Sequence, residues 1–399
     1  MNNETPTADT EVPAAAAYSL WQLLRYMLGL GSWGFGGPVA LVGFMYRDLV
    51  ERRRWITEAD YKEGMALAQL MPGPLAAQLA IYLGYVHYRI VGATLAGIAF
   101  VLPSFCMVVA LGAAYVAYGG IAWMQAVFYG VGAAVIGIIA MSAYKLTTKN
   151  IGSDKLLWAI FLASAAVTVV TKSEIVWLFL GAGLLVWLVR APPKNLFGGR
   201  LNGIAASAPV AAAMLLGTVD WPRLAEIGAF FAYAGSFVFG SGLAIVPFLY
   251  SGVVQEHHWL NDRQFVDAVA VAMITPGPVV ITTGFIGFLV AGFWGAVVAA
   301  LGTFVPCYLF TILPAPYFKK YGKRPGIVAF VDGVTAAAIG AITGAVIVIG
   351  QRSISDWATA LLALASVAVL WRFKKTPEPL VVVVAAVIGL LVYPLTNHT

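Results

Sequence analysis

Residues 31–74 read GSWGFGGPVALVGFMYRDLVERRRWITEADYKEGMALAQLMPGP, and residues 235–278 repeat the pattern as GSFVFGSGLAIVPFLYSGVVQEHHWLNDRQFVDAVAVAMITPGP. The two copies align without a gap at an offset of 204 residues, the distance from 31 to 235. Shared positions include Phe35/Phe239, Tyr46/Tyr250, Trp55/Trp259 and the closing Pro-Gly-Pro triplets. Identity at so many positions with a fixed offset is typical of an internal duplication.

The composition indicates a membrane protein. Of the 399 residues, 61% are hydrophobic and 11% are charged, against roughly a quarter charged in soluble domains. Several apolar runs exceed the ~18 residues that can cross a bilayer. Runs of this length are too long for barrel strands, so the lipid requires helices that satisfy their own backbone hydrogen bonds.

The sequence offers no pattern for a metal, a disulfide framework or a cofactor. Cys106 and Cys307 lie in apolar segments without paired spacing, and the His257-His258 pair has no metal-binding partner motif. The glycines at 34–37 lack the lysine of a phosphate-binding loop. We therefore expect no cofactor, no enzymatic activity, no nucleic-acid partner and no ATP-driven step.

The hydrophobic segments form two sets of six around a single one. They fall near 20–46, 64–86, 91–117, 121–145, 156–171 and 174–190, then 203–219, then 224–250, 268–290, 292–314, 327–350, 357–371 and 378–394. This pattern predicts an all-α polytopic membrane protein in four parts. They are a disordered cytoplasmic tail (1–19), an N-terminal repeat (20–200), a linker transmembrane segment (201–223) and a C-terminal repeat (224–399).

Basic residues are shared unevenly between matching loops. The loop after the first segment carries Arg47, Arg52, Arg53, Arg54 and Lys62, whereas the matching loop of the second copy carries Arg263. The bias reverses later, where residues 315–326 are rich in lysine and their counterpart at 116–122 has no basic residue. The positive-inside rule then predicts that the halves are inverted, with the N-terminus cytoplasmic and the C-terminus external.

This topology needs an even number of crossings between the basic loops at 47–62 and 145–155, yet three segments lie between them. The conflict disappears if 64–86 dips into the membrane and returns at its Pro-Gly-Pro triplet, because proline removes a backbone donor and ends helices. Segment 20–46 could be broken in the same way at residues 34–38. The alternative is that both segments are kinked full spans and the arginines at 52–54 break the charge rule.

Broken helices at matching places in inverted repeats indicate a transport site. A half-helix that starts after a Pro-Gly-Pro turn directs free N–H groups and a positive dipole end inward, which suits an anion. The candidate substrate-binding residues in the first copy are Phe35, Gly36, Gly37, Pro38, Arg47, Gln69, Pro72, Gly73, Pro74 and Gln78. Those in the second copy are Gly240, Ser241, Gly242, Thr275, Pro276, Gly277, Pro278 and Thr282, with Thr283 beside them.

The acidic residues of the apolar segments are few. Glu63, Asp267 and Asp332 lie near segment starts. At such places they are more often charges at a helix N-terminus than coupling carboxylates.

The motifs FGGP, MPGP and VLP in the first copy, with FGSG, TPGP and FVP in the second, resemble those of the chromate ion transporter family in its long, two-domain form. The resemblance covers about 20–190 and 224–395. It implies thirteen hydrophobic segments, a bacterial inner-membrane location and chromate efflux that confers resistance. The second copy departs from the first at Gly242, which stands where the first has Pro38, and it lacks the basic loop.

Export also agrees with the electrical gradient. Each charge that crosses 100 mV changes the free energy by about 2.3 kcal/mol, so a dianion gains roughly twice that on leaving a negative-inside cell. We expect a secondary carrier of small oxyanions, driven by the membrane potential or an ion gradient, that acts as a monomer or homodimer in the bilayer. Uptake of sulfate or of oxyanions in general, by a carrier or a channel, remains the alternative.

Overall fold

The computed structural model of the chain describes residues 17–34, 37–118, 122–171, 175–192, 220–238, 245–321, 324–354, 356–373 and 376–396. Within these residues the secondary structure is helical, with no strands. The first half contains α1 (Leu20–Trp33), α2 (Gly37–Met45), η1 (Tyr46–Arg52), α3 (Glu58–Leu70), α4 (Leu75–Tyr118), α5 (Ala122–Asn150), α6 (Lys155–Thr171) and α7 (Val176–Arg190). The second half contains α8 (Trp221–Gly235), α9 (Val246–Tyr250), η3 (Ser251–Glu256), α10 (Asp262–Ile274), η4 (Val279–Ile281), α11 (Thr282–Ile312), α12 (Ala315–Tyr321), α13 (Pro325–Ser353), α14 (Trp357–Arg372) and α15 (Glu378–Thr396).

The prediction of an all-α membrane protein is confirmed. Four stretches of the described residues are long and apolar enough to cross a bilayer: Leu75–Tyr118, Trp123–Asn150, Val279–Phe318 and Pro325–Gln351. Large apolar side chains cover the outside, such as Trp33 and Trp177. A helical protein with apolar residues on both its inside and its outside is typical of a lipid environment.

The ends of the predicted segments differ in two places. Tyr18 stacks on Trp55 with ring centroids 5.1 Å apart, and Ser19 caps α1, so the chain is ordered before residue 20. Helix α8 begins at Trp221, capped by Asp220, within the predicted linker. The predicted linker span at 203–219 and the tail up to residue 16 lie outside the described residues.

The duplication is visible in the backbone. Helices α3 and α10 begin and end at the same repeat positions, and each follows a π-helical segment, η1 or η3. Arg54 and His258 occupy one repeat position, and both have positive φ angles, 53° and 51°. A left-handed backbone costs a non-glycine residue free energy, so its recurrence at one repeat position indicates that the turn has a fixed shape.

The chain reverses direction at the first Pro-Gly-Pro triplet. Gly64 on α3 faces Tyr82 on α4 so closely that a Cβ at residue 64 would lie 2.9 Å from the ring Cε1. The neighbouring Glu63 is hydrogen-bonded to the Tyr82 hydroxyl. Since Gly64 and Tyr82 are equally far from Gly73 along the chain, α3 and the start of α4 form an antiparallel hairpin. The segment predicted at 64–86 is therefore two helices joined by a turn.

A second reversal follows in each half. Arg89 in α4 has a φ of 51°, and Gly292 in α11 has a φ of 61°. On either side of these residues the helices touch, Gly84 against the carbonyl of Gly92 and Gly287 against that of Gly295. Residues eight apart in one straight helix would be about 12 Å apart. Both α4 and α11 are thus tight hairpins of two helices, which glycine makes possible by leaving room for close approach.

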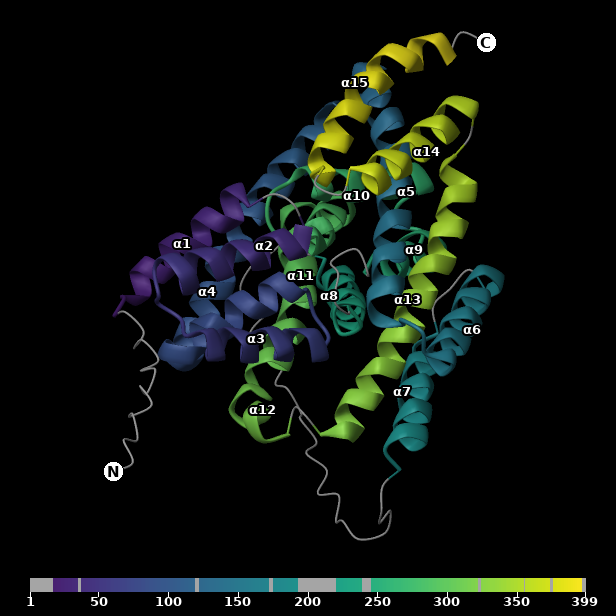
Figure 1. The fold of residues 1–399 in the computed structure, drawn as a ribbon. Helices are drawn as coiled ribbons and strands as arrows, with labels where there is room; N and C mark the ends of the chain where they lie inside the picture. The colour runs from purple at the N-terminus through teal and green to yellow at the C-terminus, as the bar shows by residue number, and fades with distance from the viewer. Residues whose placement is uncertain are drawn as a thin grey trace, which may run out of the picture.

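The two halves exchange their last helix pairs. Helices α6 and α7 pack on α13 of the second half, whereas α14 and α15 pack on α5 of the first (Figure 1). Matching glycines make close contacts in both bundles, with Gly340 against the carbonyl of Phe161 and Gly137 against that of Ala363. Small residues allow helix axes to approach closely in membranes. Each half therefore supplies one face of the other's bundle.

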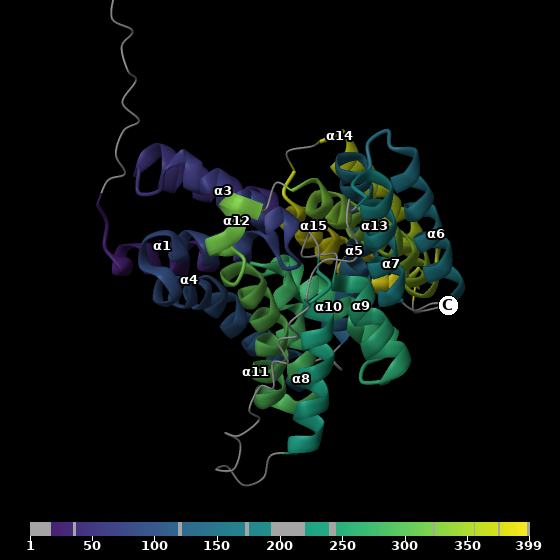
Figure 2. The same cartoon turned by 90° about the horizontal axis from the view of Figure 1, so that it is seen from below.

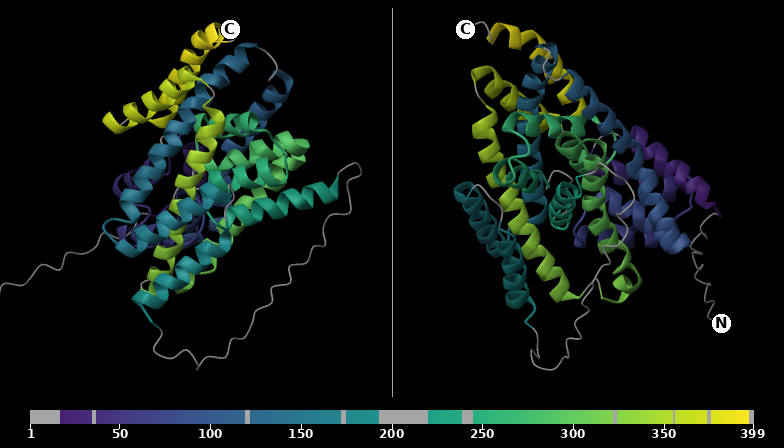
Figure 3. Two further views of the ribbon diagram at one scale, coloured as in Figure 1. Left: turned by 90° about the vertical axis from the view of Figure 1, so that its right-hand side faces the viewer. Right: turned by 180° about the vertical axis from the view of Figure 1, so that it is seen from behind.

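Helices α5 and α13 lie side by side in opposite directions (Figure 3). Ala143 packs with Ile342, and Ile136 lies 3.6 Å from where a Cβ on Gly350 would be. The two helices occupy matching positions in the repeat and run antiparallel. One apolar cluster joins the halves around this pair, running in sequence from Val108 to Ala385.

Candidate anion site

The Pro-Gly-Pro turns lie buried between the halves. Gly73 has a φ of 142° and Gly277 a φ of 96°, in the region that favours glycine. A Cβ on Gly73 would lie 2.6 Å from Nε2 of Gln78, and one on Gly277 would clash with Oγ of Ser104. Both positions therefore require glycine for conformation and for space.

Each turn is hydrogen-bonded to the other half of the chain. The N–H of Gly73 donates to the carbonyl of Val238, 2.5 Å away, after α8. The N–H of Gly277 donates to the carbonyl of Gly34, 3.1 Å away, after α1. Gly34 and Val238 are themselves equivalent in the repeat, so the two bonds form a symmetric pair that crosses the molecule.

A polar residue from the opposite half supports each turn. The hydroxyl of Ser104 donates to the carbonyl of Pro276 at 2.7 Å. Its counterpart Cys307 lies beside the other turn, with Sγ 3.0 Å from where a Cβ on Gly73 would be. Both side chains are buried. The turns thus meet groups of the other half in a closed environment, where a hydrogen bond is electrostatically stronger than in water.

Gln78 is the polar side chain closest to the first turn. It is fully buried, and its Nε2 donates to the carbonyl of Pro72 at 2.8 Å. Its Oε1 is buried and accepts no hydrogen bond within the part of the chain that is described. A buried acceptor without a donor costs free energy, so this oxygen is suited to accept from a water or from a hydroxyl group on a ligand.

The threonines of the second turn are buried but already donate hydrogen bonds. Thr282 and Thr283 donate to the carbonyls of Val279 and Val280, and Thr275 donates to that of Val271. Their hydroxyl hydrogens therefore serve the local backbone and are not directed at a ligand. Gln69, on α3, is exposed.

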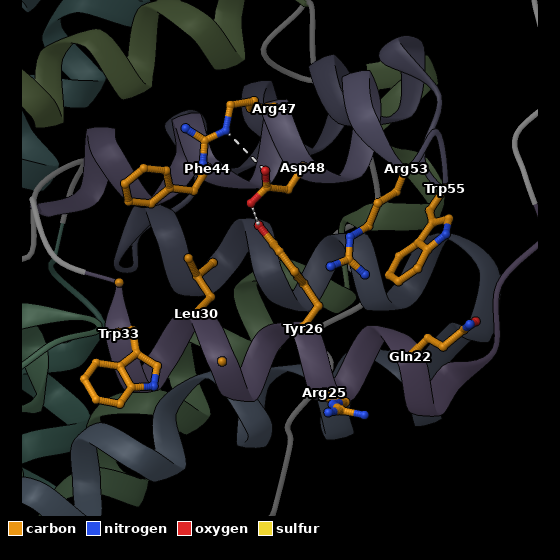
Figure 4. A pocket seen from close by; sticks show the side chains of 12 residues that line it. Gln22, Arg25, Tyr26, Leu30, Trp33, Phe44, Arg47, Asp48, Arg53 and Trp55 are labelled. Atoms are coloured by element: carbon orange, nitrogen blue, oxygen red, sulfur yellow. Dashed lines mark hydrogen bonds and ion pairs between the residues drawn. The ribbon is translucent and has the colours of Figure 1, made fainter.

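A pocket of about 690 Å³ opens between α1 and the α2–η1 segment (Figure 4). Its lining residues are Gln22, Arg25, Tyr26, Gly29, Leu30, Trp33, Gly34, Phe44, Arg47, Asp48, Arg53 and Trp55. Arginine supplies the positive charge of this lining, and Asp48 the negative charge. Because the arginines outnumber the acid, the pocket has a positive field that attracts anions.

Asp48 holds the basic groups in place. Its carboxylate accepts from Nε of Arg47 at 3.2 Å and lies 3.5 Å from Arg52. The hydroxyl of Tyr26 also donates to it, at 3.5 Å (Figure 4). Arg53 lies over the ring of Trp55, 4.6 Å from its centroid. The guanidinium groups are thus held by the Asp48 carboxylate and the Trp55 ring. In these positions their N–H donors suit a tetrahedral oxyanion.

The second half lacks the Arg–Asp pair that lines this pocket in the first half. Ser251 and Gly252 stand where the first half has Arg47 and Asp48. Gly252 packs so tightly against the ring of Phe230 that a Cβ there would clash with it. An aromatic ring thus lies beside residue 252, and the Arg47–Asp48 pair has no counterpart at these positions of the second half.

The pocket reaches the turns through Gly34. This residue lines the pocket, and its carbonyl accepts from the N–H of Gly277. Arg47 was expected from the sequence and lies in the pocket, while Arg25 and Arg53 were not among the expected residues. In the sequence these two arginines stand out only by their charge. Membrane topology already accounts for positive charge near this loop, so charge alone did not mark them as site residues.

Several expected site residues cannot be placed. Phe35, Gly36, Gly240, Ser241 and Gly242 lie outside the described residues. Gly37 and Pro38 begin α2. Within the described parts of the chain, no group of three or more histidine, cysteine or acidic residues could hold a metal ion.

The fold and the site together define a multi-pass α-helical membrane protein with a basic pocket beside two broken helices. The chain belongs to the chromate transporter family, whose sequence pattern matches residues 21–187 and again 225–390. Membership makes it a transporter, with an anion as substrate, rather than an enzyme.

Full-length relatives carry the same description. The chain is 70% identical over 401 residues to the chromate transport protein of Cupriavidus metallidurans, covering 100% of both chains. It is 60% identical to the probable chromate transport protein of Synechococcus elongatus, covering 96% of this chain and 98% of the relative. It is 30% identical to the chromate transport protein of Pseudomonas aeruginosa, covering 97% and 95%. No solved structure matches the fold.

Proposed function

We propose that this protein is a secondary transporter that exports chromate across the bacterial inner membrane and so confers chromate resistance. The observation that carries the proposal is the basic pocket whose wall at Gly34 is hydrogen-bonded to the second Pro-Gly-Pro turn. In a member of the chromate transporter family, this joins a place for anion capture to a break in the membrane helices.

The membrane potential is sufficient as a driving force. A dianion that leaves through 100 mV gains about 4.6 kcal/mol, which corresponds to a gradient on the order of a thousandfold. Uptake of the same ion would have to overcome this barrier with co-transported cations. The pocket is lined by arginines, which favours anions over cations.

We further propose that the two halves are inverted in the membrane. The antiparallel packing of α5 and α13 supports this, because both helices are long enough to span the bilayer. If both cross it, the axis that relates them lies in the membrane plane, as in transporters with inverted repeats. The same frame makes α3 and the start of α4 a re-entrant hairpin, with its turn at residues 72–74 in the membrane interior.

The charge bias then gives the orientation. The arginines of η1 and the turn after it face the cytoplasm under the positive-inside rule, with the N-terminus, and the C-terminus is periplasmic. The pocket opens to the cytoplasm in this orientation. In the second half Ser251 and Gly252 stand in place of Arg47 and Asp48, so in this orientation the pocket's charges lie on the cytoplasmic side, which supports capture from inside and release outside.

In the proposed route, chromate binds first to Arg25, Arg47 and Arg53 and then passes to the turns. The N-terminus of α4 follows the first turn and contributes the positive end of its dipole. Gln78, buried in that first turn of α4, would satisfy its free Oε1 with a water that accompanies the ion. Both turns come from one chain, so a monomer holds a complete route, and a homodimer would hold two.

The test is uptake of labelled chromate by inside-out membrane vesicles with an imposed inside-positive potential. We expect potential-driven, saturable accumulation that a modest excess of sulfate inhibits weakly. Arg47→Gln should raise the half-saturating chromate concentration about tenfold, since loss of one charged hydrogen bond costs about 1.5 kcal/mol. Arg372→Gln, at the end of α14 beside Phe373, is the matched control and should change little.

Three other outcomes of this experiment would change or contradict the proposed function. Uptake that sulfate abolishes would make the protein a general oxyanion carrier, with chromate as one of its substrates. Flux that does not saturate would indicate a channel. Chromate movement only against the imposed potential would contradict export.

A further inference from the structure

Asp267 is a buried carboxyl that the anion route does not use. It lies on α10 with a relative exposure of 3%. The hydroxyl of Tyr115, on α4, donates to its Oδ2 at 2.8 Å. Ionisable side chains buried in a membrane protein are costly and commonly belong to its transport function.

The tyrosine that donates to Asp267 lies among aromatic rings. The rings of Phe128 and Phe285 pack on Tyr115, with centroids 5.4 and 5.7 Å away. Arg263, one turn earlier on α10, is the positive charge that acts on the carboxyl, and it also donates to the carbonyl of Gln125 at 3.3 Å.

Helix α10 also packs against α5, α11, α13, α15, η3 and η4. Among the described residues of these elements, no further titratable group acts on Asp267.

The bond between Asp267 and Tyr115 joins the two halves. Helix α10 leads into the second Pro-Gly-Pro turn, whereas α4 belongs to the first half. At the matching position of the first half, Glu63 is hydrogen-bonded to Tyr82 within its own hairpin. A relative movement of the halves would therefore break the first bond and preserve the second.

We propose that Asp267 is a proton-binding site of the transporter and that chromate transport is coupled to the movement of a proton through it. The inference rests on the proposed function. As a carboxylate, Asp267 accepts from Tyr115 and holds the halves together. When it takes a proton from water on one side, the group becomes neutral and its bond with Tyr115 weakens, which allows the halves to move. Release of that proton on the other side restores the carboxylate.

The test uses the full-length protein in liposomes with a trapped pH-sensitive dye. A chromate gradient is imposed at an alkaline pH, where chromate stays a dianion and does not itself take up protons, while the membrane potential is clamped at zero with potassium and valinomycin. We expect chromate flux in the wild-type protein to change the internal pH in step with chromate moved. Asp267→Asn should still carry chromate down its gradient, but with no pH change and with a flux that is independent of pH.

Two variants separate coupling from structural support. Glu63→Gln, at the matching position, should keep the pH change. Tyr115→Phe keeps the carboxyl but removes a donor to its ionised form, so the midpoint of the pH dependence should move about one unit upward. A merely structural role for Asp267 would lower flux without moving this midpoint.

Chromate flux without proton movement in the wild-type protein would overturn this inference and leave the proposed function intact. Proton movement that persists in Asp267→Asn would overturn it as well. Absence of chromate flux from the wild-type protein would overturn both.

Discussion

At Gly277 the absence of a side chain allows the two halves of the chain to approach closely. Its φ of 96° suits glycine, and Ser104 of the other half occupies the space where a Cβ would point. The N–H of the same residue donates to the carbonyl of Gly34 at the pocket wall. A side chain here would push the halves apart at the point where pocket and turn meet.

We therefore expect Gly277→Ala to abolish chromate transport while the protein still inserts in the membrane. The clash and the positive φ act together, and alanine at such a φ costs more than about 1 kcal/mol. Ser104→Gly in the same chain should restore part of the flux by removing the clash. Gly181→Ala, on α7 with open space around its Cβ, is the control. Resistance measurements and membrane fractionation check this, and normal resistance in Gly277→Ala would remove the turn from the route.

Residue roles could be predicted from the sequence only in part. The glycine requirement of the turns follows from the Pro-Gly-Pro triplets, and the structure agrees with it at Gly73 and Gly277. The threonines looked like ligand donors, yet Thr282, at the start of α11, donates to the carbonyl of Val279 in the preceding η4. A helix always offers threonine an acceptor three or four residues back, and no sequence pattern tells which acceptor is used.

At the scale of the element, one aspartate fixes where a helix begins. Asp154 precedes α6, and its Oδ1 accepts from the N–H groups of Leu156 and Leu157 at 2.8 and 3.0 Å. Its Oδ2 pairs with Arg190 at the end of α7, which also contacts Asp332 on α13 at 2.8 Å. This group ties the exchanged α6–α7 pair to the other half.

The ion pair predicts a pH dependence of stability. The N–H of Leu157, and after it the Arg190 guanidinium, hold the pKa of Asp154 below its ordinary value. The stabilisation is therefore present above the ordinary carboxyl pKa of about 4 and is lost as pH falls through the lowered value.

Asp154→Asn keeps a capping side chain and removes the charge, so it should cost about 1 kcal/mol or less at pH 7, since the pair is about one-third exposed. Thermal unfolding in detergent should show this deficit at pH 7 and its disappearance near pH 3. Asp220→Asn, which caps α8, is the control and should show no such difference. A deficit equal at both pH values would contradict the ion-pair account.

Element boundaries were predictable where proline marks them. The break at 72–74 follows from the triplet, whereas the reversal at Arg89 has neither glycine nor proline at its centre. It depends on the close contact of Gly84 with Gly92, two residues that the sequence shows as ordinary small positions in an apolar run. Tertiary packing therefore decides that reversal.

For the whole molecule, the exchange of helix pairs makes each half depend on the other for a complete bundle. The α6–α7 pair covers α13 and the α14–α15 pair covers α5, so neither half completes its own bundle. Helix α12 also reaches across to α3 (Figure 2). The duplication could be read from the sequence, but the exchange could not, because a small-residue face does not specify its partner.

The proposed inverted arrangement predicts different labelling at two matching N-cap positions, Thr57 and Asn261. Each is the N-cap of its helix, α3 or α10. Substitution by cysteine should therefore lower the stability of each protein by a similar amount, about 1 kcal/mol, so the two variants can be compared directly. In a Cys106→Ser background, since Cys106 is the exposed native thiol, an impermeant thiol reagent added to spheroplasts should label residue 261 and not residue 57. After permeabilisation both should react. Equal labelling before permeabilisation would contradict inversion, whereas labelling of residue 57 alone would keep the inversion but turn the arginine pocket outward, which would favour uptake over export.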